Sequence, residues 1–435
     1  MIKKQLIFGL LSIGVILTSI FSRLNNWSGN DKIFLLGLVI LFMVTIISIV
    51  KAKGQRIKTM ISGLIWISLT ILIVGITFQN LNYSKTLLPT YRLGNKLNTI
   101  NVDYPSYKWA NAVPEKQNVE QQIIDSILSN KLEESYYSLS LLIVKNDTLL
   151  TEKYFKGTNS KTAFNIQSAT KSFVSVLTGI SIDKGLIPSD TSKIRGLIPE
   201  YFTPETEPLK NNITVKHLLT MQAGWDANNG KNLKGYDWIK STMSNKLKFN
   251  PGSSFLYSDI EPHILLGIIE SSSKQNILDF AKENLCNKLG ITITDWLKSP
   301  NDLCMGGGPL FMTTRDMARF GDLILKNGKI DNQKIVDSLW TAKMTTNYVE
   351  KSLMPENVPS KKYGYLLWLD SYNENEIFLV AGAGGQLIMI VPVLDMILVT
   401  TTKTDLPPIR LADNALNIQK LLTDYVRFEI DKMKE

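Results

Sequence analysis

The chain has 435 residues, a formal net charge of +9 and 44% hydrophobic residues. That length exceeds what one ordinary core needs, so we expect more than one structural unit. Residues 1–80 hold eight Lys or Arg and one Asp, which leaves only about +2 on the rest of the chain. The basic balance therefore does not indicate a nucleic-acid partner, and no sequence feature defines an oligomeric state.

Three stretches without a charged side chain lie at the start of the chain, at residues 5–22, 33–50 and 60–78. Each is close to the ~20 apolar residues that a helix needs to cross a bilayer. None shows the polar face of a surface helix. A signal peptide is the poorer interpretation of the first stretch, because no small-residue cleavage site follows and two more stretches come next. We predict a membrane region at residues 1–80 with three transmembrane helices.

The positive charges predict the orientation of these helices. Lys3 and Lys4 precede the first stretch, and four more basic residues fill the loop at 51–58. By the positive-inside rule, the N-terminus and this loop are cytoplasmic. We therefore expect a multi-pass protein of the cell (inner) membrane, with the lipid bilayer as a partner. After a linker at 81–115, residues 116–435 would form a domain on the extracytoplasmic side.

Periodicity and turn signals predict the elements of that domain. Helices are expected at 117–130, 168–185, 213–225, 260–274, 277–290, 313–328 and 410–427, those at 260–274 and 277–290 being amphipathic. Strands are expected as a hairpin at 137–155, a strand at 363–369 and two strands at 385–402. Terminal strands that join one antiparallel sheet, flanked by helices and with an all-helical insert, make an α+β fold.

The cysteines and histidines give no sign of a metal site or a cofactor. Cys286 and Cys304 are the only cysteines, and they either form a disulfide or are two buried small hydrophobes. His217 and His263, the only histidines, lie on apolar helices and are expected to be structural. Neither residue type occurs at metal-ligand spacing, and a Ser-His-Asp triad is a poor alternative.

Ser168 and Lys171 are three positions apart in the sequence NIQSATKSF. On a helix such side chains share a face, with Cβ atoms about 5–6 Å apart. A lysine accepts a proton only if burial or a neighbouring cation lowers its pKa, and Ser–Lys pairs are a known variant of the nucleophile and base. The alternative is an exposed helix start, with Ser168 as the N-cap and Lys171 solvated.

Two further triplets follow in the order that penicillin-recognising enzymes show. They are Tyr257–Asp259 (YSD) and Val380–Gly382 (VAG). With them the chain resembles the serine β-lactamase-like hydrolases, in the branch related to class C β-lactamases, from about residue 117 to 425. The resemblance rests on the ordered landmarks FNIQSATKSF, ITVKHLLTMQAGW, NPGSSFLYSD, GGGPLFMTTRDMARFGDLIL, YGYLLWL and AGAGGQ.

The resemblance implies a β-lactamase/transpeptidase-like fold and a serine hydrolase that works through an acyl-enzyme. Ser168 would be the nucleophile that becomes acylated, Lys171 would help to deprotonate it, and Tyr257 would pass the proton to the leaving group. A phenol has a pKa near 10, which nearby cations lower, so a proton path without histidine is chemically sound. The other interpretation of Tyr257 is a buried aromatic with a structural hydroxyl partner.

The resemblance also places an oxyanion hole, made by the backbone N–H groups of Ser168 and Ala383. Gly382 and Gly384 would support it on a strand that begins near residue 382. Gly306–Gly308 lacks the phosphate-loop pattern and is interpreted as a flexible turn that lines the pocket. For Trp368 we expect core packing rather than pocket lining.

Two residues depart from the family pattern. Asp259 replaces an Asn, and its carboxylate would tend to raise the pKa of Lys171. Val380 replaces the Lys that contacts the substrate carboxylate. The sequence therefore favours a small-molecule or cell-envelope ester or amide as substrate. A true β-lactamase or D-amino-acid peptidase, a catalytically silent penicillin-binding-like envelope protein, and a structural envelope protein remain alternatives.

Overall fold

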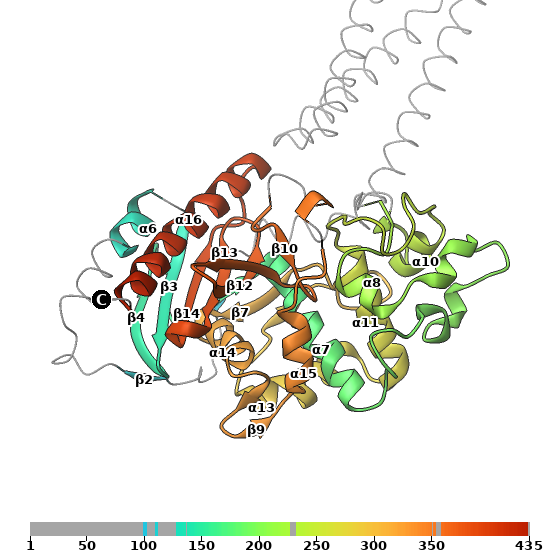
Figure 1. Ribbon diagram of the computed structural model, residues 1–435, viewed down its shortest axis with the longest axis horizontal. Helices are drawn as coiled ribbons and strands as arrows, with labels where there is room; N and C mark the ends of the chain where they lie inside the picture. The colour runs from blue at the N-terminus through green and yellow to red at the C-terminus, as the bar shows by residue number, and fades with distance from the viewer. Residues whose placement is uncertain are drawn as a thin grey trace, which may run out of the picture. The chain divides into compact units, whose positions relative to one another are not determined.

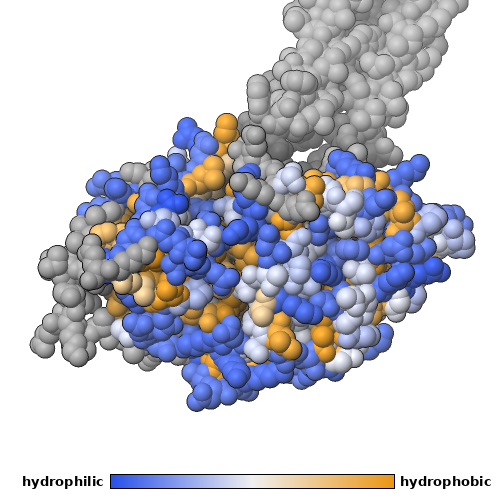
Figure 2. Space-filling view, viewed as in Figure 1, coloured by the Kyte–Doolittle hydropathy of each residue, from blue (hydrophilic) through white to orange (hydrophobic). Residues whose placement is uncertain are grey.

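The computed structural model describes residues 99–101, 109–111, 128–135, 137–226, 232–349, 351–353 and 358–433, which belong to one compact unit. The predicted spans lie outside these residues. No helix of the described part is long and apolar enough to cross a bilayer. Polar residues cover most of the face shown in Figure 2, with apolar ones scattered among them. The membrane region and its orientation stay predictions.

The described residues are organised around a mixed sheet of eight strands (Figure 1). Their order across the sheet is β10 (Lys362–Tyr363), β11 (Trp368–Tyr372), β12 (Asn375–Gly382), β13 (Gln386–Val391), β14 (Met396–Thr402), β3 (Ser138–Lys145), β4 (Thr148–Tyr154) and β2 (Ala110–Asn111). Neighbours are antiparallel except β2, which is parallel to β4. Because β14 pairs with β3, strands from the two ends of the domain meet in one sheet, as predicted.

Two smaller sheets complete the strands of the described part. One has the order β1 (Thr99–Asn101), β5 (Thr162–Asn165), β7 (Leu310–Thr313) and β6 (Asp295–Trp296), and the other pairs β8 (Lys329–Ile330) with β9 (Gln333–Lys334). Strands β1 and β2 fall inside the range predicted to be a linker. Their pairing with β5 and β4 joins those parts of the range to the domain.

The helices of the described part include the predicted ones in the predicted order. They are α6 (Asn130–Ser135), α7 (Thr170–Asp183), α8 (Val215–Leu219), α10 (Trp238–Met243), α11 (Ile260–Ser273), α12 (Ile277–Ala281), α13 (Asn287–Leu289), α14 (Thr314–Leu325), α15 (Ser338–Met344) and α16 (Pro408–Lys432). Two of them, α10 and α15, were not predicted. Helix α14 packs on β3, β13 and β14, and α16 packs on β13. All residues of β13 and β14 are buried, and since alternate side chains point to opposite faces, both faces are covered.

The helical insert confirms the α+β plan but differs in detail from the expectation. Helix α11 is not amphipathic, because α7, α8, α10 and α12 surround it and bury most of its residues. The helix expected at 277–290 contains a π-helical turn at Lys282–Cys286. The helix expected at 213–225 ends at Leu219, although Thr214 caps its start as predicted. Of the helix expected at 117–130, only the end is described, and it continues to Ser135.

The strand predicted at 363–369 is wrong, since a turn separates β10 from β11. Leu366 in this turn has a left-handed backbone with φ of +54°. Its N–H donates to the carbonyl of Leu219 (2.8 Å) and its carbonyl accepts the Ser172 hydroxyl (2.6 Å). These bonds to α8 and α7 replace the ladder bonds that a continuous strand would have made.

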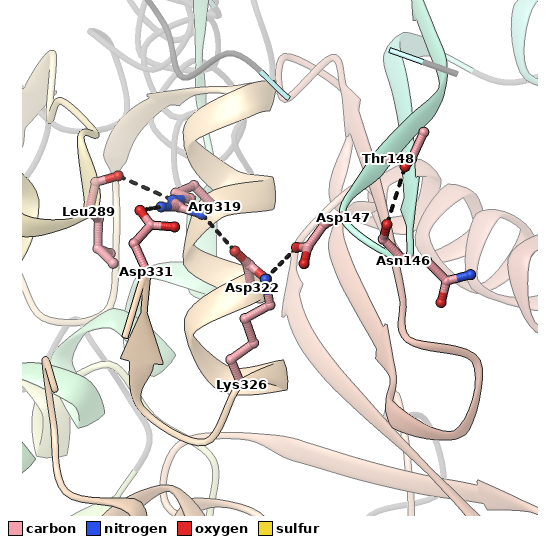
Figure 3. A network of polar contacts seen from close by, with 8 residues as sticks. All are labelled: Asn146, Asp147, Thr148, Leu289, Arg319, Asp322, Lys326 and Asp331. Atoms are coloured by element: carbon pink, nitrogen blue, oxygen red, sulfur yellow. Dashed lines mark hydrogen bonds and ion pairs between the residues drawn. The ribbon is translucent and has the colours of Figure 1, made fainter. Parts of the chain in front are cut away.

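A polar network on α14 joins separate parts of the domain (Figure 3). The guanidinium of Arg319 binds Asp322 (2.8 Å) on the same helix and Asp331 (2.6 Å) in the β8–β9 hairpin. Lys326 binds Asp322 (3.3 Å) and extends the network to the turn between β3 and β4. Arg319 and Asp322 are buried, whereas Asp331 is exposed.

We expect Arg319→Met to lower the free energy of unfolding by about 3 kcal/mol, because removing one partner leaves a buried carboxylate poorly compensated. Asp331→Asn should change it by less than about 1 kcal/mol, since exposed ion pairs contribute little. Denaturant unfolding of the full-length variants measures both values. Equal losses in the two variants would contradict this assignment of the network.

Candidate active site

Ser168 lies on a sharp turn between a strand and a helix. Strand β5 ends at Asn165, and Ser168 is in the 3-10 helix Gln167–Ala169 that leads into α7. Gln167 has a left-handed backbone, with φ of +53°. Its N–H donates to the Asn165 side chain (2.9 Å) and its carbonyl accepts the Thr170 hydroxyl (2.7 Å). Strained residues of this kind persist where the surroundings fix them, and they cluster at functional sites.

Lys171 is in the first turn of α7 and is only 1% exposed. Its Nζ donates to the Oγ of Ser168 (2.9 Å), the Oδ1 of Asp259 (2.5 Å) and the carbonyl of Gly307 (3.2 Å). An ammonium has three N–H donors, so each one has a partner. The alternative of a solvated Lys171 at an exposed helix start is therefore wrong.

Two effects act in opposite directions on the pKa of Lys171. Burial lowers it, as the sequence led us to expect, but the Asp259 carboxylate and, less strongly, Tyr257 raise it. The net result is a pKa above the ordinary value for lysine. Lys171 is consequently an ammonium group that donates to Ser168. Its predicted role in deprotonating Ser168 stays a prediction.

Tyr257 lies beside this ammonium group and within an aromatic cluster. Its ring centroid is 4.7 Å from the Nζ of Lys171. The ring stacks on Trp368 (centroids 5.4 Å apart, 30° between planes) and meets the edge of Tyr363 at 6.2 Å. Trp368 is buried in the core, as expected, and it also fixes the face of Tyr257. The catalytic role of Tyr257 stays a prediction.

Gly306–Gly308 is closely packed rather than flexible. A Cβ at Gly306 would overlap the backbone of Pro262, and one at Gly307 would overlap the side chain of Asp259. Gly308, with φ of +127°, would place a Cβ 2.8 Å from the carbonyl oxygen of Gln167. The segment therefore fits between the start of α11 and the Ser168 turn, and it has no room for side chains.

Glu261 is a buried acid that the sequence analysis missed. It is 1% exposed, in the first turn of α11, and its carboxylate accepts the Ser258 hydroxyl. Burial raises its pKa to about 8, and the negative charge of Asp259 acts in the same direction. One signal for it was present in the sequence, because Asp259 and Glu261 are two acids two positions apart beside Tyr257. The apolar residues that follow made the segment look like an ordinary core helix.

The strand expected to begin near residue 382 instead ends there. Strand β12 finishes at Gly382, a turn covers Ala383–Gly385, and β13 begins at Gln386. A Cβ at Gly382 would overlap the carbonyl oxygen of Ile166, so this strand end lies against the segment before Ser168. Ala383 is exposed in the turn. Its predicted role as an oxyanion donor stays a prediction.

Val380 is fully buried in β12, where it pairs with Ile388. In a strand, side chains two positions apart share a face. Val380 therefore points to the same side as Gly382, which lies against the segment before Ser168. This position of the sheet offers an apolar side chain where the family pattern has a cation.

The histidines and cysteines are structural. The Nδ1 of His217 accepts the N–H of Thr214 (3.2 Å) and completes the cap of α8. His263 contacts the carbonyl of Cys304 (3.1 Å), and burial lowers its pKa to about 4. Cys286 and Cys304 are free thiols, and burial raises the pKa of each to about 12. Of the two interpretations of the cysteines, buried small hydrophobes is correct.

The raised pKa of Glu261 predicts a pH-dependent stability. The carboxyl ionises near pH 4.5 in the unfolded chain but near pH 8 in the folded one. The folded state holds the extra proton between these values, so Glu261 makes stability fall as pH rises from about 5 to 8. Glu261→Gln should remove that contribution and become more stable relative to wild type across this range.

Melting temperatures of the full-length proteins at pH 5 and pH 8 measure this difference. The exposed Glu283→Gln variant is the matched control and should follow wild type at both values. If the melting temperatures of Glu261→Gln also equal those of wild type at both pH values, the buried carboxyl does not titrate between pH 5 and pH 8.

Comparisons with known proteins agree with this fold. A family model described as Beta-lactamase matches residues 121–422. An uncharacterized protein of Alkalihalophilus pseudofirmus is 22% identical over 291 residues, which is 58% of this chain and 80% of that protein. A Salmonella typhimurium protein, assigned by name to the D-alanyl-D-alanine carboxypeptidases, is 24% identical over 244 residues. That match covers 48% of this chain and 55% of the relative, so the chain spans little more than half of it.

Among solved structures, a Bacillus anthracis protein assigned by name to the 6-aminohexanoate-dimer hydrolases has the same fold. Its TM-score is 0.60 at 20% identity, and the superposition covers 79% of this chain and 95% of that one. At this identity the similarity shows a shared fold, the α+β architecture described above. The family model matches more than two thirds of this chain, and this match shows that the chain belongs to the β-lactamase family.

Proposed function

We propose that the protein is a membrane-anchored, extracytoplasmic serine hydrolase that cleaves an ester or amide through an acyl-enzyme on Ser168. The observation that carries this proposal is the 2.9 Å hydrogen bond from the buried ammonium of Lys171 to the Ser168 oxygen. An activated nucleophile needs a neighbour that favours its charged form. Membership of the β-lactamase family supports the reaction class.

In the proposed acylation, the Oγ of Ser168 forms a bond to the substrate carbonyl carbon while its proton passes to the oxygen of Tyr257, which acts as a phenolate. Lys171 stays protonated and stabilises the negative charge that develops on the serine oxygen. The backbone N–H groups of Ser168 and Ala383 bind the carbonyl oxygen as it becomes an oxyanion. Tyr257 then gives this proton to the leaving group as the bond between the carbonyl carbon and the leaving group breaks. In the second step water attacks the acyl carbon, its proton passes by way of Tyr257 to the Oγ of Ser168, and the bond from Oγ to the acyl group breaks.

The proposed substrates are esters or amides that have no carboxylate group to be bound by a positively charged side chain at the end of β12. Val380 is apolar and fully buried there, and the positive charge of Lys171 is already bound to Asp259. The names of the Salmonella and Bacillus relatives suggest peptides and amides as substrate classes. We therefore expect this site to hydrolyse such esters or amides faster than β-lactams.

Location at the membrane forms part of the proposal. The uncharged stretches at 5–22, 33–50 and 60–78 would anchor the chain. The basic residues at the N-terminus and in the 51–58 loop would keep those parts in the cytoplasm. The hydrolase domain would then meet small-molecule or cell-envelope substrates outside the cell membrane.

We expect the full chain to hydrolyse p-nitrophenyl esters with an initial burst, because acylation releases the chromophore before deacylation. Ser168→Ala should abolish turnover while the melting temperature changes little. A parallel panel of D-amino-acid amides and nitrocefin ranks the substrates, with nitrocefin expected to react slowly. Fast nitrocefin cleavage would favour the β-lactamase alternative, and no turnover of any substrate would favour the catalytically silent one.

The pH–rate profile of Asp259→Asn tests the charge state of Lys171. Asp259 raises the pKa of Lys171, so its removal lowers that pKa. If the ammonium form is the active one, the alkaline limb of kcat/KM moves to lower pH in the variant. Asp302→Asn, which breaks the surface pair with Lys298, should leave the profile unchanged. A downward shift of the acidic limb instead would mean that neutral Lys171 is the base.

A further inference from the structure

The turn Ala383–Gly385, which we call the oxyanion turn, has an unusual backbone. Gly384 and Gly385 both have positive φ values, +85° and +101°. Neither has room for a side chain, because a Cβ would meet Leu411 at 2.9 Å or Ile418 at 2.6 Å, both on α16. The turn therefore lies between the Ser168 segment, which the end of β12 touches, and the C-terminal helix.

Side chains behind the turn bind its carbonyl groups. The carbonyl of Gly384 accepts the Asn414 side-chain amide (2.6 Å) and the Thr402 hydroxyl (2.8 Å). The carbonyl of Gly385 accepts the Thr400 hydroxyl (2.9 Å). All three donors are buried, so these bonds form in a low-dielectric setting where they are strong.

Gln386 fixes the direction of the Thr402 hydrogen bond. Its side-chain amide donates to the carbonyl (2.7 Å) and the hydroxyl oxygen (2.9 Å) of Thr402, and its side-chain oxygen accepts the N–H of Thr402 (3.2 Å). Because the hydroxyl oxygen accepts from Gln386, its hydrogen is available for Gly384. Asn414, Gly384, Thr402 and Gln386 are therefore joined in one continuous hydrogen-bond network.

The bonds to Gly384 restrain the direction of the N–H of Ala383 through the peptide groups of the turn. In a trans peptide the C=O and N–H point in opposite directions. The carbonyl of Gly384 shares its peptide plane with the N–H of Gly385, which donates to the carbonyl of Gly382 (3.4 Å). The carbonyl of Gly382 in turn shares its peptide plane with the N–H of Ala383, so holding the Gly384 carbonyl restrains that N–H through one intermediate hydrogen bond. A glycine-rich turn without such bonds would have many accessible conformations, and an oxyanion donor needs a fixed one.

The sequence position of Asn414 argues against a role in helix docking alone. It begins the i, i+4 series Asn414, Ile418, Leu422, Val426 and Ile430 along the buried face of α16, which also includes Thr423 and Glu429. Asn414 is 5% exposed, and the other four members of the series are apolar. Burying an amide is unfavourable unless it is hydrogen-bonded, and an aliphatic residue would suffice for packing. The side-chain amide of Asn414 donates its hydrogen bond to the carbonyl of Gly384.

We propose that Asn414 and Thr402 are positioning residues for the oxyanion turn: they act through the carbonyl of Gly384 to hold the turn in the geometry that acyl transfer from Ser168 requires. This inference rests on the proposed serine hydrolase function. Neither residue touches the substrate. Both lie outside the Ser168, Tyr257 and Val380 motifs, on the last strand and the last helix of the chain.

The test compares Thr402→Val, which has the same shape without the hydroxyl, with Thr402→Ser, which keeps it. Asn414→Leu removes the second donor. Thr158→Val is the matched control, because it removes a hydroxyl that binds the carbonyl of Leu139 (2.7 Å) away from the site. Each full-length variant is assayed with a p-nitrophenyl ester, titrated with phenylboronic acid, which forms a tetrahedral adduct on a serine oxygen, and melted.

We expect kcat to fall about tenfold in Thr402→Val and Asn414→Leu with KM changed less than twofold, since loss of a whole oxyanion donor costs about 10²–10³. The affinity for phenylboronic acid should fall in parallel, and Thr402→Ser should recover most of both. A kcat that is unchanged in folded variants, or that falls equally in Thr158→Val, would overturn the inference. Absence of turnover in wild type would instead refute the proposed function.

Discussion

The ammonium group of Lys171 is buried, and its hydrogen bonds join three segments that are far apart in the sequence. Its partners are Ser168, Asp259 at the start of α11 and Gly307 in the glycine segment. A buried charge is tolerated only when its bonds are satisfied, so these segments must converge for the domain to be stable. The same requirement brings together the groups that the proposed reaction needs.

Close packing and a left-handed backbone residue fix the position of the groups around this ammonium. Glycine at 306 and 307 allows the backbone to approach α11, and the left-handed Gln167 sets the direction of the Ser168 turn. Trp368 holds the ring of Tyr257 from the sheet side. A site built in this way is preorganised, which is the property that electrostatic catalysis depends on.

Much of the fold could be predicted from the sequence because its signals are local. The hairpin around Asn146 and Asp147 has two positive-φ residues in its turn, and Thr313 caps α14 as its position indicates. Periodicity was sufficient for the order of the longer helices and for the strands of 137–155 and 385–402, but it did not indicate α10, α15 or β12. It failed at 363–369, where bonds to α7 and α8 bend an apolar run, and in α11, where neighbours cover every face.

Local signals were less informative about the site. The Ser168–Lys171 spacing and the Tyr257 triplet identified the positions, but the charge of Lys171 depends on the balance between burial and Asp259, which only the folded structure defines. Glu261 was missed because its burial comes from packing around α11. The bonds from Thr402 and Asn414 to Gly384 join residues 18 and 30 positions apart, and no local pattern indicates them.

The central claim is that Ser168 is an activated nucleophile. Incubation of the full chain with a fluorophosphonate probe, followed by proteolysis and mass spectrometry, tests it directly. We expect one adduct, on the peptide that contains Ser168, and its loss after unfolding or in Ser168→Ala. A folded protein that shows no adduct, or an adduct on a different residue, would contradict it.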